Sequence, residues 1–243
     1  MTALGFLYPG HSAEDDYQRI EHLLGSDIRL DVIHTDIGED AHRVDALLEM
    51  GSADRLAAGV EKLRLCGAEA VVWACTSGSF VYGWEGAQDQ IRTLARTAGM
   101  PASSTSLAFV HAVRELGVRR VAIGATYPED VADLFAEFLG AAGVEVTGVR
   151  GAGIITAAEV GEWTEEDVRA LAQESDAPEA EALLLPDTAL HTASHIEKLE
   201  HQLSKPVLTA NQVTVWEALR LTTRKVNAPT LGTLFTRQPL PQP

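Results

Sequence analysis

Short apolar runs alternate with segments of helical periodicity along the whole chain. The apolar runs predict strands at residues 3–8, 28–34, 69–74, 101–104, 119–125, 144–149, 181–186 and 205–209. The segments between them predict helices at residues 14–24, 52–66, 86–98, 106–116, 129–142, 164–174, 192–203 and 211–221. Strands that are regularly followed by helices form right-handed βαβ units. We therefore predict an α/β protein with mostly parallel sheets that helices cover on both faces.

The two halves of the chain resemble each other in short segments that keep the same order. Residues 4–9 are echoed by 121–128, residues 71–77 by 183–189, and residues 101–106 by 206–211. The repeat predicts two pseudo-symmetric subdomains, each a mostly parallel four-stranded sheet flanked by helices, with an active-site cleft between them. Ligands of open parallel sheets bind beyond the carboxyl ends of the strands. Because Cys75 and Asp187 occupy matching places in the two copies, we expect them on opposite walls of that cleft.

The repeat also suggests where the subdomains begin and end. We place the first at residues 1–105, together with a C-terminal helix at about 211–243, and the second at 106–210. Residues 235–243 are expected to form a tail with little structure of its own. Residues 36–45 are acidic and polar without a clear period, so we expect a loop that could act as a lid over the cleft.

Composition narrows the choice of partners. The formal net charge is −16, which argues against nucleic acid and anionic membranes as partners, because either would need a basic surface. No apolar run approaches the roughly 20 residues that span a bilayer, and the amino terminus does not resemble a signal peptide, so we expect a cytoplasmic protein. The two cysteines are too few for a disulfide scaffold, and the composition is compatible with a homo-oligomer.

The sequence Ala-Cys-Thr-Ser-Gly-Ser at residues 74–79 carries the strongest chemical signal. A cysteine that leaves a buried strand before small polar residues can lie over free backbone N–H groups, which would lower its pKa and make it a nucleophile. The same N–H groups, with the Thr76 and Ser77 hydroxyls, would bind a substrate carboxylate. The alternative is a buried structural cysteine followed by a turn. We favour a catalytic Cys75, whereas Cys66 is expected to be a core residue at a helix end.

Asp187 allows two interpretations. It could act as a general acid or base if its surroundings favour the protonated form. It could equally cap a following helix by accepting hydrogen bonds from backbone N–H groups. Asp187, His191 and His195 recur every four residues, and two histidines with this spacing on a helix can bind a metal. We expect no metal site here, because Asp187 should precede the helix and no further ligand is evident.

Together these residues resemble the aspartate/glutamate racemase superfamily, in the branch with maleate cis–trans isomerase, arylmalonate decarboxylase and the ectoine-utilisation proteins. The most specific segments are residues 74–79 and 188–220, and the segment Asn-Gln-Val-Thr-Val-Trp-Glu-Ala-Leu-Arg at 211–220 is very similar to maleate isomerase. The resemblance implies cofactor-independent chemistry on carbon next to a carboxylate. It also implies that Tyr127, Thr76, Ser77 and Thr188 bind the carboxylate and that Cys75 is the first catalytic cysteine.

The chain departs from the superfamily pattern in two places. Asp187 stands where the isomerases and racemases have a second cysteine, and Gly10-His11 stands where an asparagine is expected. Arylmalonate decarboxylases keep their proton-donating cysteine on the second wall, so the resemblance favours an isomerase or racemase-like enzyme on a small carboxylate. The alternatives are a decarboxylase or lyase of a malonate-like acid, and a carboxylate-binding protein without catalysis.

Overall fold

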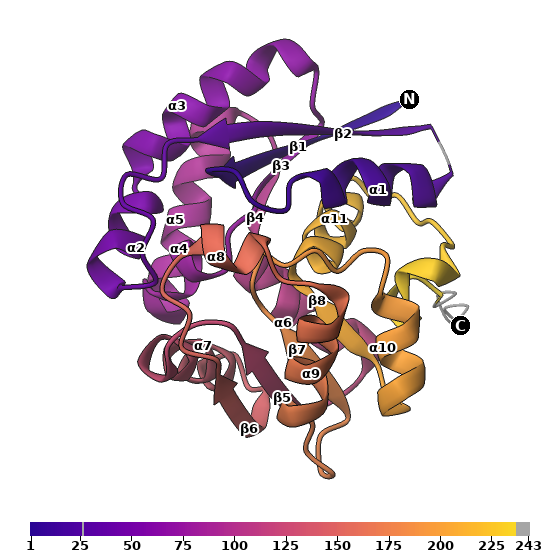
Figure 1. Cartoon of the computed structure of the whole chain (residues 1–243). Helices are drawn as coiled ribbons and strands as arrows, with labels where there is room; N and C mark the ends of the chain where they lie inside the picture. Colours follow the sequence, from indigo (N-terminus) through magenta and orange to yellow (C-terminus); the bar gives the residue numbers. More distant parts are fainter. Residues whose placement is uncertain (26, 237–243) are drawn as a thin grey trace.

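Two parallel four-stranded sheets form the framework of the protein, which a computed structural model describes for residues 1–25 and 27–236 (Figure 1). The first sheet has the order β2-β1-β3-β4 and contains β1 Thr2–Pro9, β2 Ile28–Thr35, β3 Ala70–Trp73 and β4 Ala102–Ser104. The second has the order β6-β5-β7-β8 and contains β5 Arg120–Ala125, β6 Glu145–Gly151, β7 Ala182–Leu185 and β8 Val207–Thr209. The predicted fold class is confirmed, because the same relative strand order recurs in each half.

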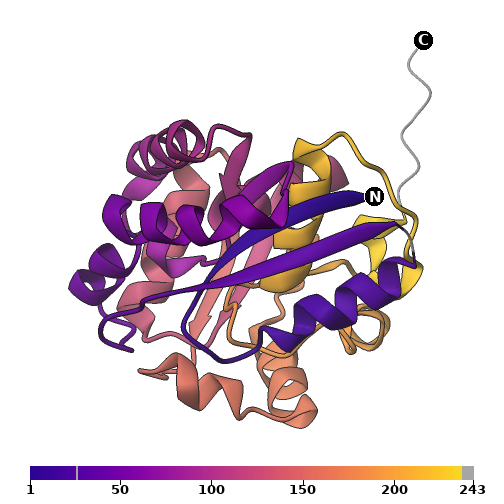
Figure 2. The same cartoon turned by 90° about the horizontal axis from the view of Figure 1, so that it is seen from above.

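Helices cover both sheets (Figures 1 and 2). In the first half these are α1 Asp15–Leu24, α2 Val44–Met50, α3 Ala53–Leu63, α4 Ser77–Phe80, α5 Gly83–Ala98 and α6 Thr105–Leu116. In the second half they are α7 Glu129–Ala141, α8 Ala157–Gly161, α9 Glu165–Ser175, α10 Ile196–Leu203 and α11 Ala210–Leu221. Short 3-10 turns span Arg64–Cys66, Pro229–Leu231 and Thr233–Phe235. Among the described residues, no helix is both long and apolar enough to cross a bilayer.

A continuous apolar core joins the two halves. Phe135 of α7 contacts Phe80 of α4, with ring centroids 5.2 Å apart, and Phe109 of α6, with centroids 5.5 Å apart. Helix α11 packs against α6 and against β3 of the first sheet. Interiors packed in this way resist small displacements. The carboxyl ends of the two sheets are therefore held in a fixed relation to each other.

The sequence prediction differs from the structure in its short elements. Helices α2, α4 and α8 were not predicted, and α2 begins at Val44 inside the predicted loop. Helix α10 begins at Ile196 rather than at residue 192. Phe235, predicted to begin the tail, is buried, because the 3-10 turn at Thr233–Phe235 directs it into the core. The remainder of that prediction, residues 237–243, lies outside the described residues.

Candidate active site

A small cavity lies at the carboxyl ends of the strands, between the two halves. Its volume is about 40 Å³, and both Cys75 and Asp187 line it. Its polar lining also includes Ser77 and Thr188, whereas Ile37, Leu47, Met50 and Ala157 make an apolar part. A water molecule needs roughly 10–15 Å³ measured in this way, so the cavity accommodates only a few waters. The cleft predicted from the repeat therefore exists, and residues of both halves form it.

Cys75 is the second residue after β3 and is buried, with 3% of its surface exposed. Its Sγ accepts a hydrogen bond from the backbone N–H of Gly78 at 3.2 Å. Burial raises the pKa of Cys75 to about 11 and outweighs this hydrogen bond, and the nearby Asp187 carboxylate raises the pKa further. The predicted N–H contact is present, but the predicted lowering of the pKa is wrong, because the thiolate would be desolvated. Cys75 is a thiol at neutral pH.

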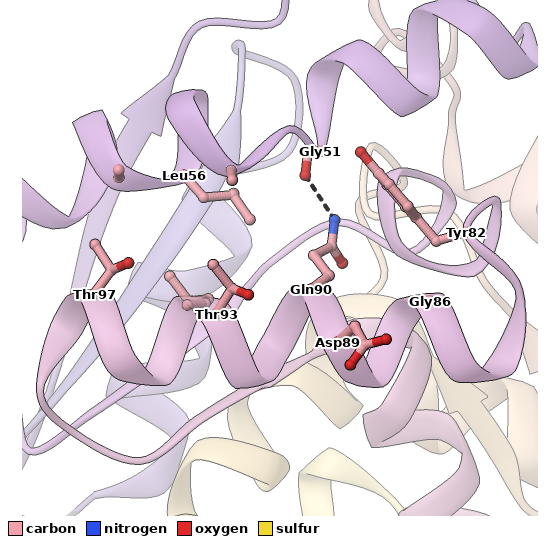
Figure 3. A pocket seen from close by; sticks show the side chains of 11 residues that line it. Gly51, Leu56, Tyr82, Gly86, Asp89, Gln90, Thr93 and Thr97 are labelled. Atoms are coloured by element: carbon pink, nitrogen blue, oxygen red, sulfur yellow. Dashed lines mark hydrogen bonds between the residues drawn. The ribbon is translucent and has the colours of Figure 1, made fainter.

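Two side chains hold the Gly78 peptide against Cys75, and the sequence did not identify either. The carbonyl oxygen of Gly78 accepts hydrogen bonds from Trp73 Nε1 at 3.2 Å and from Gln90 Nε2 at 2.9 Å. Gln90 Nε2 also donates to the carbonyl oxygen of Gly51 at 2.8 Å (Figure 3). Gln90 lies on α5 beside a separate groove of about 270 Å³ that does not include Cys75. Its amide group thus links α5 to α4, just after the cysteine, and to the end of α2.

Asp187 follows β7 on the second wall and has 4% of its surface exposed. Its Oδ1 accepts a hydrogen bond from the Ala189 N–H at 2.8 Å, and its Oδ2 accepts one from the Thr126 hydroxyl. The interpretation as a helix cap is wrong, because the helix that follows Asp187 begins only at Ile196. The local N–H contact that this interpretation required is nevertheless made, within a turn.

The residues expected to bind a carboxylate divide into two pairs. Ser77 and Thr188 line the cavity. The Tyr127 hydroxyl donates to the carbonyl oxygen of Pro186 at 3.0 Å, and burial raises the pKa of Tyr127 well above its usual value. Thr76 is also buried, and its Oγ1 has no hydrogen-bond partner among the described residues. Neither Tyr127 nor Thr76 belongs to the lining of the cavity.

The acidic segment between β2 and α2 covers the cavity and reaches the second half of the chain. The backbone N–H of His42 donates to the carbonyl oxygen of Ile155 at 2.6 Å, and His42 Nδ1 donates to that of Ile154 at 2.9 Å. The Asp40 carboxylate accepts hydrogen bonds from the first two N–H groups of α8 at 2.9 and 3.1 Å. The position over the cleft was predicted, whereas the role of His42 in this crossing was not.

The alternative group of Asp187, His191 and His195 does not assemble. His191 Nε2 lies 2.8 Å from Asp15, and His195 Nδ1 lies 3.4 Å from Glu165. The two histidines precede α10 rather than sharing one of its faces. Each therefore pairs with a different carboxylate.

The two equivalent sheets and the intervening cavity define the class of the chain as an aspartate/glutamate racemase-like α/β protein. The profile of the arylmalonate decarboxylase family matches residues 49–235. Arylmalonate decarboxylase of Bordetella bronchiseptica is 33% identical over 178 residues, which are 72% of this chain and 74% of the relative. The chain belongs to the arylmalonate decarboxylase family.

Other relatives support the same branch. Maleate isomerase of Geobacillus stearothermophilus is 28% identical over 136 residues, which are 56% of this chain and 54% of the relative. A solved double variant of arylmalonate decarboxylase, with one cysteine introduced and another replaced by serine, has a TM-score of 0.82 at 25% identity. That similarity covers 97% of this chain and 99% of the variant. Maleate cis–trans isomerase of Nocardia farcinica has the same fold, with a TM-score of 0.89 at 20% identity over 97% of this chain and 98% of the isomerase.

Proposed function

We propose that the chain is a cofactor-independent decarboxylase of a small malonate-like dicarboxylate, with the Cys75 thiol as proton donor. The observation that carries the proposal is the state and place of that thiol. Cys75 is protonated at neutral pH, because burial raises its pKa to about 11, and it lines a cavity between the two sheets. A proton donor needs the thiol form, whereas a nucleophile needs the thiolate.

The two sides of the cavity suit the two carboxylates of such a substrate. A carboxylate against Ile37, Leu47 and Met50 would lack hydrogen-bond donors, so its burial there costs desolvation free energy. Its departure as neutral CO₂ removes this desolvation cost. The retained carboxylate, held by Ser77 and the Thr188 segment, would accept the electron pair of the broken C–C bond as an enediolate. The Cys75 S–H proton then passes to the α-carbon, and the resulting thiolate regains a proton from solvent.

Asp187 has a different part in this scheme from the one first expected. Its carboxylate lies close enough to Cys75 to contribute to the raised pKa of the thiol. A fixed negative charge on the second wall therefore opposes thiolate formation on the first. Asp187 thereby adds to the effect of burial, which favours the thiol form of Cys75 between turnovers.

The second candidate is an isomerase or racemase-like reaction on a small carboxylate. The maleate isomerase relative favours it, as does the position of an acidic residue across the cavity from Cys75. That reaction would require the buried thiol to ionise before it adds to a double bond. The free-energy cost is about 1.4 kcal/mol per pH unit below the pKa, which for Cys75 is about 11.

Substrate assays separate the two candidates. The purified chain is incubated with phenylmalonate, with small alkylmalonates and with maleate, while CO₂ and the organic products are measured. Decarboxylation in D₂O should place one deuterium on the α-carbon, and Cys75→Ala should abolish it while Cys66→Ala should not. Conversion of maleate to fumarate without CO₂ release would favour the isomerase. Binding of these acids without turnover would leave only a carboxylate-binding protein.

A further inference from the structure

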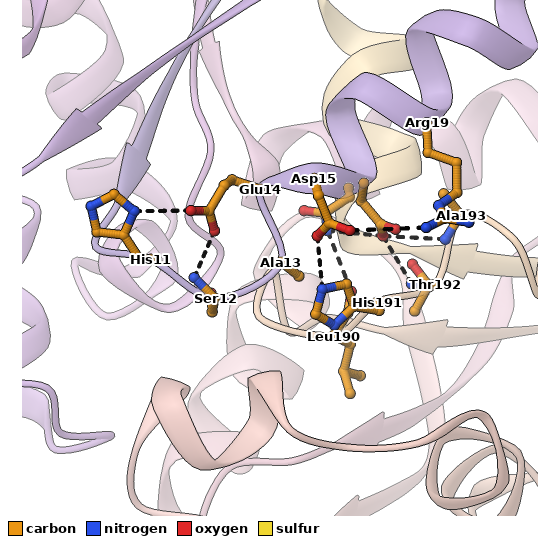
Figure 4. Close-up of polar contacts among 12 residues, drawn as sticks. His11, Ser12, Ala13, Glu14, Asp15, Arg19, Leu190, His191, Thr192 and Ala193 are labelled. Carbon is orange, nitrogen blue, oxygen red and sulfur yellow. Dashed lines mark hydrogen bonds and ion pairs between the residues drawn. The ribbon is translucent and has the colours of Figure 1, made fainter.

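Three side chains with metal-binding atoms meet at the edge of the cavity. His11 and Glu14 lie in the turn between β1 and α1, and His34 lies near the end of β2 (Figure 4 shows His11 and Glu14). One ligand atom from each residue falls within 4.8 Å of the other two. His11 also lines the cavity that contains Cys75. The cluster is therefore separate from the catalytic cysteine but adjoins the same space.

Both imidazole rings are oriented by an oxygen acceptor at Nδ1. His11 Nδ1 lies 2.9 Å from Glu14 Oε1, and His34 Nδ1 donates to the carbonyl oxygen of Gly10 at 2.6 Å. With its Nδ1 engaged by a carbonyl, a neutral His34 presents the Nε2 lone pair, whereas His11 Nδ1 and Glu14 Oε1 face each other and would both bind a cation that enters between them. Histidines that bind metals in proteins usually have their second nitrogen hydrogen-bonded to a carboxylate or a carbonyl. The two rings also stack, with centroids 3.9 Å apart, so the free nitrogens belong to neighbouring rings.

Glu14 supplies carboxylate oxygens next to these rings. Its Oε1 lies 2.9 Å from His11 Nδ1, and its Oε2 accepts a hydrogen bond from the Ser12 N–H at 2.7 Å. The side chain of His11 is 72% exposed and that of Glu14 is 29% exposed. The exposed His11 ring is free to turn as a cation enters, so no buried group has to move.

We propose that His11, Glu14 and His34 bind a divalent transition-metal ion of the Zn²⁺ or Co²⁺ type at the rim of the cavity. Two imidazole nitrogens and one carboxylate oxygen form a ligand set that Zn²⁺ accepts, and such a set leaves a coordination position for water or a ligand. The cavity lining includes no lysine or arginine among the described residues. A bound cation would thus be the strongest positive charge beside a site that contains Asp40 and Asp187.

The experiment measures metal binding alone and does not depend on the proposed function. The full chain, free of any histidine tag, is titrated with CoCl₂ and separately with ZnCl₂. Calorimetry measures the heat of binding, and the visible absorption of Co²⁺ reports its coordination. One equivalent should bind to the wild type. His11→Ala, which alters an exposed side chain, should weaken binding by at least about tenfold, the size of effect known for groups that support metal sites. His34→Gln and Glu14→Gln should do the same.

Matched controls identify the site. His22→Ala and His201→Ala remove exposed histidines elsewhere and should bind metal as the wild type does. Cys75→Ala should also retain binding, because the proposed ligand set contains no sulfur. Unchanged affinity in the His11→Ala/His34→Gln double variant would overturn the proposal. Loss of binding in Cys75→Ala alone would overturn it as well, since the metal would then belong to the cysteine.

Discussion

Gly51 lies directly against Gly78, so that a Cβ atom added to Gly51 would be 2.1 Å from the Gly78 carbonyl oxygen. Gly78 is the residue whose N–H donates to Cys75 Sγ, and Gln90 bonds both glycine carbonyls. Gly51 has an ordinary backbone conformation, with φ at −86°. Glycine is therefore required here because a Cβ atom has no space, and not because the backbone is strained. The end of α2 and the cysteine loop form one tightly packed unit.

Gly51→Ala should displace this unit and reduce turnover. The added methyl group meets backbone, which cannot rotate away, so we expect a loss of stability of about 1–3 kcal/mol, as for other overpacked sites. Thermal unfolding and substrate turnover give the two readouts. Gly140→Ala is the matched control, because a Cβ there has no atom within 4 Å. Equal turnover by Gly51→Ala and the wild type would show that the packing does not position Cys75.

The reactivity of Cys75 should rise with pH well into the alkaline range. Its pKa is about 11, so thiolate is scarce at neutral pH, and rapid labelling there is not expected, contrary to what the sequence suggested. In a Cys66→Ser background, labelling by iodoacetamide should be slow at pH 7 and still be increasing at pH 9. A rate that levels off near neutrality would contradict the assignment of Cys75 as a thiol.

Asp187→Asn should make Cys75 easier to ionise. The substitution removes a negative charge that raises the Cys75 pKa, while an asparagine oxygen can still accept from the Ala189 N–H. Burial remains the main cause of the raised pKa, so we expect labelling at a fixed pH to become severalfold faster rather than to approach that of a free thiol. Asp187→Ala serves as a control that loses the hydrogen bonds as well. No change in labelling by Asp187→Asn would exclude the electrostatic role.

Asp16→Asn should flatten the dependence of stability on pH. Asp16 is buried, and its Oδ2 accepts hydrogen bonds from the N–H groups of Thr192 and Ala193 at 2.8 and 3.2 Å and from Asn211 Nδ2 at 3.3 Å (Figure 4 shows Thr192 and Ala193). Burial raises the pKa of Asp16 in spite of these bonds and the nearby His191. The folded state therefore binds the proton more tightly than the unfolded state. Stability is lost as pH rises from the unfolded pKa of about 3.9 through the raised folded value.

Asparagine cannot ionise but retains an oxygen acceptor for the two N–H groups. The free energy of unfolding of wild type and Asp16→Asn, measured by denaturant at several pH values, gives the comparison. The free energy of unfolding of the variant should increase relative to that of the wild type as the pH rises above about 4. Glu137→Gln, at an exposed position of α7, is a control for a general change in charge. Parallel pH profiles for wild type and Asp16→Asn would contradict the expected linkage.

The fold could be predicted from the sequence because its parallel strands are buried. A strand such as β7, with Ala-Leu-Leu-Leu, reads as a continuous apolar run because both of its faces are covered. The echo between Cys75 and Asp187 then placed both residues at strand ends in one cleft. The four-residue helix α4 was missed because Ser-Gly-Ser-Phe is too short to show a helical period.

The surroundings of the site could not be predicted in the same way. The Gly78 peptide is positioned by Gln90, which is 12 residues away, and the cavity is covered by His42, whose ring partner is 112 residues away. Neither contact leaves a local pattern. The raised pKa of Cys75 also depends on burial by several elements, whereas the sequence showed only the adjacent N–H groups. His11, Glu14 and His34 meet only because β1 and β2 pair in parallel.

Asp40 and His42 form hydrogen bonds with residues at and before the start of α8, and this crossing affects how tightly any substrate is held. A cavity of about 40 Å³ has to widen before it accepts a dicarboxylate, and Asp40, His42 and Ala157 of that crossing all line it. The apparent dissociation constant then equals the intrinsic one divided by the fraction of molecules that are open. Variants that loosen the crossing should capture substrate more readily and exclude water less well. The same few contacts therefore determine both the affinity for a ligand and the exclusion of water from the cavity.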